Sequence, residues 1–206
     1  MAHKNYIEKD GIKYYSVTTL LGIIRKPGLE VWRGKIGNEM ADAIMTASAE
    51  FGRECHDYAR IINQGKGHEI NLDKIEPILQ GKVKWYRDWW FENIEEVILS
   101  EENIFSKKFQ YQGTPDLIAK LKGIKSLAVI DFKTGNNIYR DTDYQLSAYK
   151  EAVMEDKGIK VKDRIILHLP REGEKNQAIV LDPNNHTADF NGFLYARSLY
   201  LNFHKK

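Results

Sequence analysis

The chain has 206 residues, of which 42% are hydrophobic and 29% are charged, and its formal net charge at pH 7 is +2. This composition is ordinary for a soluble globular protein, and the length allows a substantial core in a single domain over residues 1–206. Because the charges nearly balance, an anionic partner would have to be bound by a local basic patch. The candidate residues for such a patch are Lys107, Lys108, Lys120, Lys122, Lys125 and Arg171. Each basic stretch alone is as well explained as solvated surface.

Cys55 is the only cysteine. A single cysteine excludes an intramolecular disulfide, a thiolate-ligated zinc site and an iron–sulfur cluster, and it fits a reducing, intracellular setting. No apolar run approaches the roughly 20 residues that span a bilayer. Residues 1–10 are polar and lack the apolar core of a signal peptide. We therefore expect a cytoplasmic protein with no membrane partner.

The first half of the chain is predicted to be mainly helical. Ser16 follows a short extended segment and is placed to cap a helix that continues through 20–24. The pattern is again helical from 29 to about 63. Interruptions of this second helical stretch are expected near Gly37 and before Gly52.

A further helix is expected to begin at 71–73, where Asp73 and Glu76 have the spacing of a capping box. The apolar residues that follow recur at the helical period, and Trp85 and Trp89 widen the apolar stripe. Tryptophans in such a cluster are far more often core residues than platforms for DNA bases. We assign them to the core.

The chain then changes to short apolar runs separated by turn-forming residues, which predicts strands. The expected strands are 97–99, 109–111, 117–121, 127–132, 164–169 and 177–181. One hairpin is expected with Gly123 in its turn, and a second around Gly173. Helices are expected at 141–156 and, at the C-terminal end, around 190–201.

This order of elements predicts an α/β fold with one central mixed β-sheet flanked by helices on both faces. No repeat, low-complexity tract or shift in composition divides the sequence. The expected parts are a helical N-terminal half (14–95), a catalytic sheet core (96–160), and a C-terminal hairpin and helix (161–206).

Asp131 and Lys133 are the first pair of residues that indicates chemistry. They are separated by one residue, so on a strand both side chains point to the same face. The residues before them, 127–130, are all apolar, as expected for a central strand that is buried on both faces. An isolated buried ion costs several kcal/mol and has to be paired or metal-bound. The alternative is a surface Asp–Lys pair at a strand end.

Asp116 strengthens the functional interpretation. It enters an apolar strand fifteen positions before Asp131, and the predicted hairpin would place the two carboxylates near one another at the same sheet end. Adjacent carboxylates repel, and a divalent cation relieves that repulsion. Oxygen ligands of this kind suit Mg²⁺, or Mn²⁺ as a substitute, rather than zinc.

The pattern closely resembles the PD-(D/E)XK nuclease superfamily, in particular its RecB-like exonuclease branch. Pro115-Asp116 matches the PD element, and Asp131-Phe132-Lys133 matches the (D/E)XK element. The branch continues with Gln-x-x-x-Tyr on a helix, which Gln145 and Tyr149 reproduce.

Two upstream positions extend the resemblance, which covers roughly residues 14–160. The branch has a histidine in a Gly-x-x-x-His context, matched by Gly52 and His56. It often has an upstream strand glutamate, for which Glu101 is the best counterpart and Glu102 the fallback. Relatives with an iron–sulfur cluster carry cysteines that this chain lacks. The resemblance implies the restriction-endonuclease-like form of the α/β fold, without that cluster.

The resemblance also implies roles for these residues. Asp116 and Asp131 would ligate Mg²⁺ together with the backbone carbonyl of Phe132, and Lys133 would orient or activate the attacking water. The remaining implied roles are metal ligation by His56 and Glu101, and positioning of the scissile phosphate by Gln145 and Tyr149.

Each outlying residue also has a structural explanation. Thr142 and Gln145 have capping-box spacing, so Gln145 could simply begin its helix. Tyr149 could be a core residue with a satisfied hydroxyl, and His56 a structural or surface histidine.

The resemblance implies a Mg²⁺-dependent deoxyribonuclease, most simply an exonuclease acting on the ends of linear DNA in phage or bacterial recombination and repair. A recombination or single-strand-binding protein is a candidate partner. The alternatives are a nucleic-acid- or partner-binding module that keeps the fold with little catalysis, and a structure-specific endonuclease.

Overall fold

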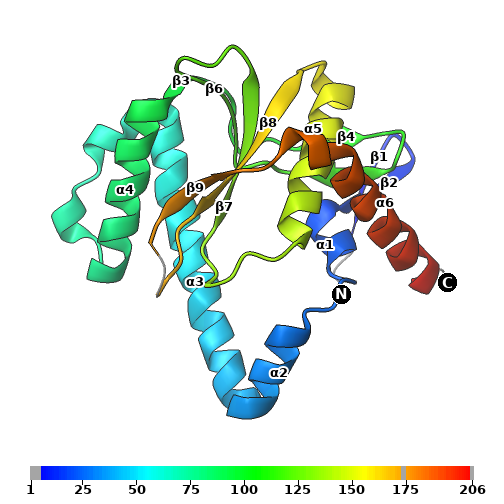
Figure 1. The fold of residues 1–206 in the computed structure, drawn as a ribbon, viewed down its shortest axis with the longest axis horizontal. Helices are drawn as coiled ribbons and strands as arrows, with labels where there is room; N and C mark the ends of the chain where they lie inside the picture. Colours follow the sequence, from blue (N-terminus) through cyan, green and yellow to red (C-terminus); the bar gives the residue numbers. More distant parts are fainter. Residues whose placement is uncertain (1–5, 173–174, 205–206) are drawn as a thin grey trace.

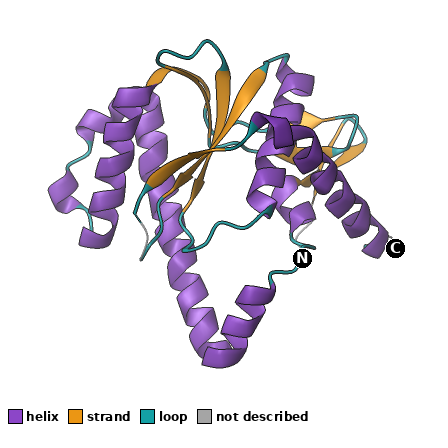
Figure 2. Cartoon of the chain, in the orientation of Figure 1, coloured by secondary structure: helices purple, strands orange, loops and turns teal. Residues whose placement is uncertain are grey.

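The computed structural model describes residues 6–172 and 175–204. Two mixed sheets are flanked by helices (Figures 1 and 2), which confirms the predicted α/β class. The first elements are β1 (Tyr6–Lys9), β2 (Ile12–Ser16), α1 (Val17–Leu21), α2 (Pro27–Ile36), α3 (Asn38–Ile61), three short helical turns (Ile62–Lys66, Gly67–Glu69, Leu72–Lys74) and α4 (Pro77–Asn93). The remaining elements are β3 (Ile94–Leu99), β4 (Ile104–Ser106), β5 (Tyr111–Gly113), β6 (Leu117–Leu121), β7 (Leu127–Lys133), α5 (Asp141–Lys157), β8 (Val161–His168), β9 (Gln177–Val180), a turn (Pro183–Asn185) and α6 (His186–Phe203).

The larger sheet has five strands in the order β3-β6-β7-β8-β9. β6 and β7 form the predicted antiparallel hairpin, with Leu117 opposite Ile130. β7 and β8 are parallel and are connected through α5, as a parallel pair requires. β8 and β9 pair antiparallel as predicted, and the expected turn around Gly173 lies outside the described residues.

A second sheet, in the order β1-β2-β5-β4, was not predicted. The expectation of one sheet was therefore wrong. The two central strands of this second sheet, β2 and β5, are parallel, with Tyr15 opposite Tyr111. Contacts so distant in the sequence leave no trace in local periodicity, and β4 and β5 have only three residues each. The strand predicted at 109–111 is found at Tyr111–Gly113, as β5.

The five-stranded sheet separates two hydrophobic clusters. Along β7, Val129 packs into the cluster beneath α5 and α6, whereas Ala128 and Ile130 pack into the cluster beneath α3 and α4. Figure 1 shows these two pairs of helices on opposite sides of the sheet. Since side chains alternate along a strand, Asp131 and Lys133 share the face of Val129 and lie toward α5.

α2 and α3 form a helical arm that projects from the sheet (Figure 1). The predicted interruption at Gly37 is confirmed, because Gly37 adopts a φ of +84° between the two helices. The predicted interruption before Gly52 is wrong, since α3 continues to Ile61. A Cβ at position 52 would lie 3.0 Å from Oγ1 of Thr134. Gly52 therefore allows a close approach of α3 to the end of β7.

Helix starts were predicted with mixed success. Ser16 caps α1, and its Oγ accepts a hydrogen bond from Thr19 N at 3.0 Å, as expected. The capping box at Asp73 and Glu76 is wrong, because Glu76 is itself the N-cap and α4 begins at Pro77. Pro77 suits the first helical position, where its missing N–H costs no hydrogen bond.

The described tryptophans of α4 lie partly buried against the cluster beneath α3 and α4, in agreement with their assignment to the core. Among residues 6–172 and 175–204, no helix combines the length and apolar character that crossing a bilayer requires.

Candidate functional site

A cavity of about 350 Å³ lies where β6 begins and β7 ends. The cavity brings together most of the residues that the sequence singled out. Those that line it are His56, Asp116, Asp131, Phe132, Lys133, Gln145 and Tyr149.

Asp116 directly precedes β6 and connects two parts of the site. Its Oδ2 accepts a hydrogen bond from Phe132 N at 2.7 Å, so its carboxylate continues the pairing of β6 with β7. Its Oδ1 lies 3.2 Å from Nδ1 of His56 on α3. The His56 ring also packs edge-on against Phe132, with centroids 5.7 Å apart. Asp116 therefore connects the sheet to the arm.

Asp131, Lys133 and Gln145 form a closed polar network. Asp131 is only 2% exposed and forms an ion pair with Lys133. Gln145 Nε2 donates to Asp131 Oδ1 at 3.0 Å, and Lys133 Nζ donates to Gln145 Oε1, also at 3.0 Å. The amide of Gln145 thus fixes the carboxylate and the ammonium relative to each other.

The capping-box explanation of Gln145 is wrong. The N-cap of α5 is Arg140, so Thr142 already lies inside the helix. The Gln145 side chain is 8% exposed and uses both ends of its amide in the network around Asp131.

Burial and neighbouring charge shift the protonation equilibria of the site. Burial raises the pKa of Asp131 to about 6; the Lys133 ammonium opposes this rise and the charge of Asp116 adds to it. Burial lowers the pKa of Lys133, but Asp131 and Asp116 outweigh it and the net shift is upward. Burial likewise lowers the pKa of His56, and the hydrogen bond to Asp116 and its charge raise it overall. Lys133 is therefore a cation at neutral pH.

Tyr149 lies one helical turn after Gln145 and supports it. Its hydroxyl oxygen accepts a hydrogen bond from Gln145 Nε2 at 3.0 Å. Burial raises the pKa of Tyr149, so the hydroxyl stays protonated at neutral pH. Tyr149 is 4% exposed and belongs to the core cluster beneath α5 and α6. Tyr149 is therefore a core residue whose hydroxyl also contacts Gln145 in the site.

Glu101 differs from the expected placement. It follows β3 in a turn with a φ of +53° instead of lying on the strand. Its backbone N–H donates to Pro115 O at 3.2 Å, whereas its carboxylate pairs with Arg60. Glu101 is not among the described residues that line the cavity, and the fallback Glu102 is exposed. Glu101 is thus linked to the Pro115-Asp116 segment by its backbone, and its carboxylate is engaged by Arg60.

Among the described residues, no three His, Cys, Asp or Glu side chains converge into a ready-made metal-binding group. The candidate ligands are engaged in pairs, His56 with Asp116 and Asp131 with Lys133. Of the expected metal ligands, His56, Asp116, Asp131 and Phe132 therefore line one cavity, whereas Glu101 does not.

A buried chain of hydrogen bonds behind Asp116 was missed from the sequence. Ser100 Oγ donates to the Asp116 carbonyl oxygen and Asn63 Nδ2 donates to Ser100 Oγ, each at 3.3 Å. The Tyr86 hydroxyl donates to Asn63 Oδ1. These residues come from three separate segments, and no spacing in the sequence connects them. They hold the backbone at Asp116.

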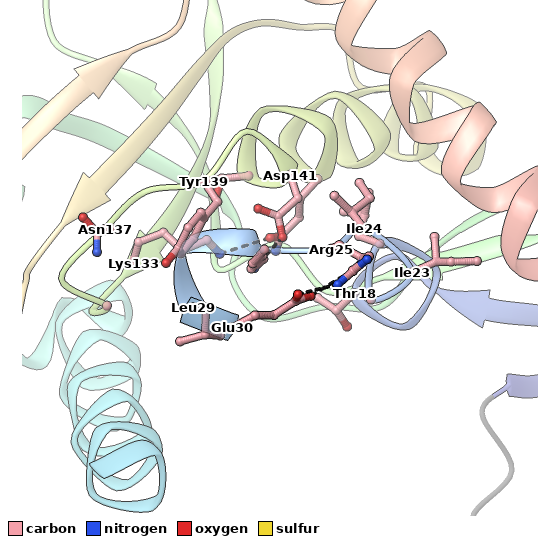
Figure 3. A pocket seen from close by; sticks show the side chains of 16 residues that line it. Thr18, Ile23, Ile24, Arg25, Leu29, Glu30, Lys133, Asn137, Tyr139 and Asp141 are labelled. Carbon is pink, nitrogen blue, oxygen red and sulfur yellow. Dashed lines mark hydrogen bonds and ion pairs between the residues drawn. The ribbon is translucent and has the colours of Figure 1, made fainter. Parts of the chain in front are cut away.

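A groove of about 710 Å³ adjoins the cavity and shares Thr18, Lys133 and Gln145 with it. One wall comes from α1 and the start of α2, and the other from the segment between β7 and α5. Figure 3 shows Leu29 and Glu30 on the first wall, with Tyr139 and Asp141 on the second. Any long substrate that reaches Lys133 along this groove passes between the two walls.

No protein-family model and no curated protein matches the sequence. Among solved structures, a “putative exonuclease” from Eubacterium rectale superposes with a TM-score of 0.53 at 13% identity, over 94% of this chain and 83% of that chain. The chain shares the fold of that protein. A second structure, SSO0001, reaches a TM-score of 0.47 at 11% identity, over 98% of this chain and 80% of that one. Neither likeness identifies a reaction.

Proposed function

We propose that the protein is a metal-dependent nuclease of the PD-(D/E)XK type that hydrolyses phosphodiester bonds in DNA. The observation that carries the proposal is the convergence of Asp116, Asp131 and Lys133 on one cavity at a sheet end. The fold shared with a protein named as a putative exonuclease supports it. Exonuclease action, the RecB-like branch and a place in phage or bacterial recombination and repair rest on the sequence resemblance.

The residues fit a divalent cation in their chemistry. Asp116 lies close enough to Asp131 for its charge to raise the pKa of Asp131, and a cation would remove that cost. The carboxylate oxygens and the Phe132 carbonyl oxygen suit Mg²⁺ or Mn²⁺, and the His56 imidazole would be an additional nitrogen ligand. The cation would compete with Lys133 for Asp131 and with His56 for Asp116. When bound, it would lower the pKa of a water and polarise the phosphate.

The chain's own residues supply the rest of the chemistry. Lys133 is cationic at neutral pH and partly open to the cavity, so it can offset negative charge that develops on the phosphate. Gln145 holds Lys133 and Asp131 in register, and Tyr149 holds Gln145. This preorganisation limits how far the ammonium can move between substrate binding and bond cleavage.

Digestion of end-labelled linear, circular and single-stranded DNA tests the proposal, with Mg²⁺, Mn²⁺ or EDTA in parallel. We expect linear DNA to yield products with either metal and none with EDTA. Cleavage of closed circles would instead support a structure-specific endonuclease. Absence of products with both metals, together with an unchanged melting temperature, would overturn the enzyme assignment.

One observation favours a second candidate, a nucleic-acid-binding module with little catalysis. The Asp131 carboxylate is paired with the Lys133 ammonium and the Asp116 carboxylate with His56, so side chains of the protein itself already engage both carboxylates. In that case DNA should bind equally well with and without Mg²⁺. The two candidates therefore differ in the metal dependence of both binding and cleavage.

A further inference from the structure

The two walls of the 710 Å³ groove are joined by an ion pair. Lys26 Nζ, at the start of α2, lies 2.8 Å from Asp141 Oδ2, at the start of α5. The ammonium also lies 4.8 Å from the centroid of the Tyr139 ring. All three residues line the groove that leads to Lys133. The pair therefore crosses the path to the catalytic cavity.

Helix stability does not explain why a lysine occupies position 26. Lys26 is the N-cap residue of α2, where the helix dipole disfavours a positive charge. None of the described residues of α2 is buried, so core packing does not fix this end of the helix. The two side chains are 34% and 16% exposed, and partly exposed ion pairs of this kind contribute little to the stability of a fold.

Asp141 is in the opposite situation. It is the first residue of α5, where the positive end of the helix dipole favours a carboxylate. If Lys26 left, Asp141 would remain stabilised by its own helix. The Lys26 ammonium can thus leave Asp141 for another anion at a low cost in free energy.

We propose that Lys26 binds a phosphate of the substrate in the groove, and that Asp141 holds Lys26 in place until the substrate enters. The inference rests on the proposed nuclease function and assigns one further contact to the same site. The ammonium exchanges one anionic oxygen for another, and the Asp141 carboxylate that it leaves stays at the N-terminus of α5. Asp141 then acts as a competitor of the nucleic-acid backbone for Lys26.

This competition predicts opposite effects for the two partners. We expect Lys26→Gln to weaken binding of a fluorescein-labelled single-stranded oligonucleotide about 5- to 10-fold in anisotropy titrations with EDTA or Ca²⁺. For Lys26→Gln, the slope of log affinity against log salt concentration should become shallower by about 0.7, which corresponds to the loss of one phosphate contact. Asp141→Asn should tighten binding about threefold or more, because it releases Lys26 and removes a negative charge. Lys26→Arg should retain binding.

An exposed ion pair on α4 provides the matched control. Lys84 and Asp88 lie 2.6 Å apart and away from the groove. Lys84→Gln and Asp88→Asn should leave affinity unchanged, and melting temperatures should show that all variants fold. Weaker binding for both Lys26→Gln and Asp141→Asn would overturn the inference and make the pair purely structural.

The failure of the inference differs from the failure of the proposed function. A wild-type protein that cleaves DNA, with both groove variants binding as wild type does, overturns only the role of Lys26. A wild-type protein that neither binds nor cleaves nucleic acid overturns the nuclease assignment and this inference together.

Discussion

Gly113 lies directly against the ring of Tyr149: a Cβ at position 113 would come within 2.3 Å of Tyr149 Cε1. The tyrosine that supports Gln145 is therefore held by a glycine at the end of β5, two residues before the Pro115-Asp116 pair. The contact connects the smaller sheet to the cavity that Asp116 and Asp131 line.

Gly113→Ala should displace Tyr149 and, through it, Gln145. We expect a loss of about 1–3 kcal/mol in the free energy of unfolding, measured by urea denaturation, and at least a tenfold loss of nuclease activity. Gly81→Ala is the control, since a Cβ there meets no described atom within 4 Å. Alanine at this exposed position of α4 should stabilise the protein by about 0.5–1 kcal/mol. Equal behaviour of the two variants would contradict the contact.

Asp131→Ala should abolish Mg²⁺-dependent cleavage, because it removes a ligand of the proposed metal. It should also lower the stability of the fold, because it leaves the Lys133 ammonium and the Gln145 amide without their partner. Circular dichroism checks the fold and an end-labelled DNA assay checks activity. Wild-type activity in this variant would exclude the site.

Lys133→Ala should lower turnover by about 100-fold or more while Mn²⁺ still raises the melting temperature, since the ammonium acts on the phosphate and not on the metal. The exposed ion pair of Lys84 with Asp88 supplies a control, and Lys84→Ala should leave turnover unchanged. Loss of both turnover and metal binding in Lys133→Ala would assign the lysine a structural role.

His56 should make the stability of the metal-free protein depend on pH. Its folded-state pKa is raised above the ordinary 6.5, so the pair with Asp116 contributes fully below pH 6.5 and is lost as pH rises through the folded value. In EDTA, the melting temperature of the wild type should exceed that of His56→Gln by about 2 °C at pH 5.5. The difference should shrink toward pH 8.5. A difference that grows with pH would show that the histidine is neutral in this pair.

Cys55 should resist thiol reagents in the native state. It is 5% exposed, and burial raises its pKa to about 12, so the thiol stays protonated at pH 8. Labelling with a chromogenic disulfide reagent should be slow in buffer and fast in denaturing urea. Rapid, complete labelling of the native protein would show that α3 opens away from α4.

Local physics was enough to predict the central hairpin and its polar residues. Two apolar runs flank the turn that contains Gly123, which predicts a hairpin. Asp131 and Lys133 are two positions apart, so on a strand they must share one face. The helical period likewise places Gln145 and Tyr149 on one side of α5. These relationships need only the geometry of a strand, a turn and a helix.

The errors arose where distant segments meet. The sequence predicts a helix interruption before Gly52, whereas Gly52 lies within α3 and allows its close approach to Thr134. The resemblance predicts Glu101 on a strand, whereas Glu101 follows the strand and contacts the carbonyl of Pro115 and Arg60. Local sequence does not encode which partner a side chain meets across the fold.

The sequence by itself therefore determined the α/β class and a β6–β7 hairpin with Asp116, Asp131 and Lys133 at one sheet end, because these follow from the short-range periodicity of the backbone. Gln145, Tyr149 and His56 were indicated by the family resemblance. Only the tertiary structure decided the second sheet, the pairing of His56 with Asp116 and the crossing of the groove by Lys26 and Asp141. Those features depend on contacts between segments that are far apart in the chain, which packing selects only once the whole core has formed.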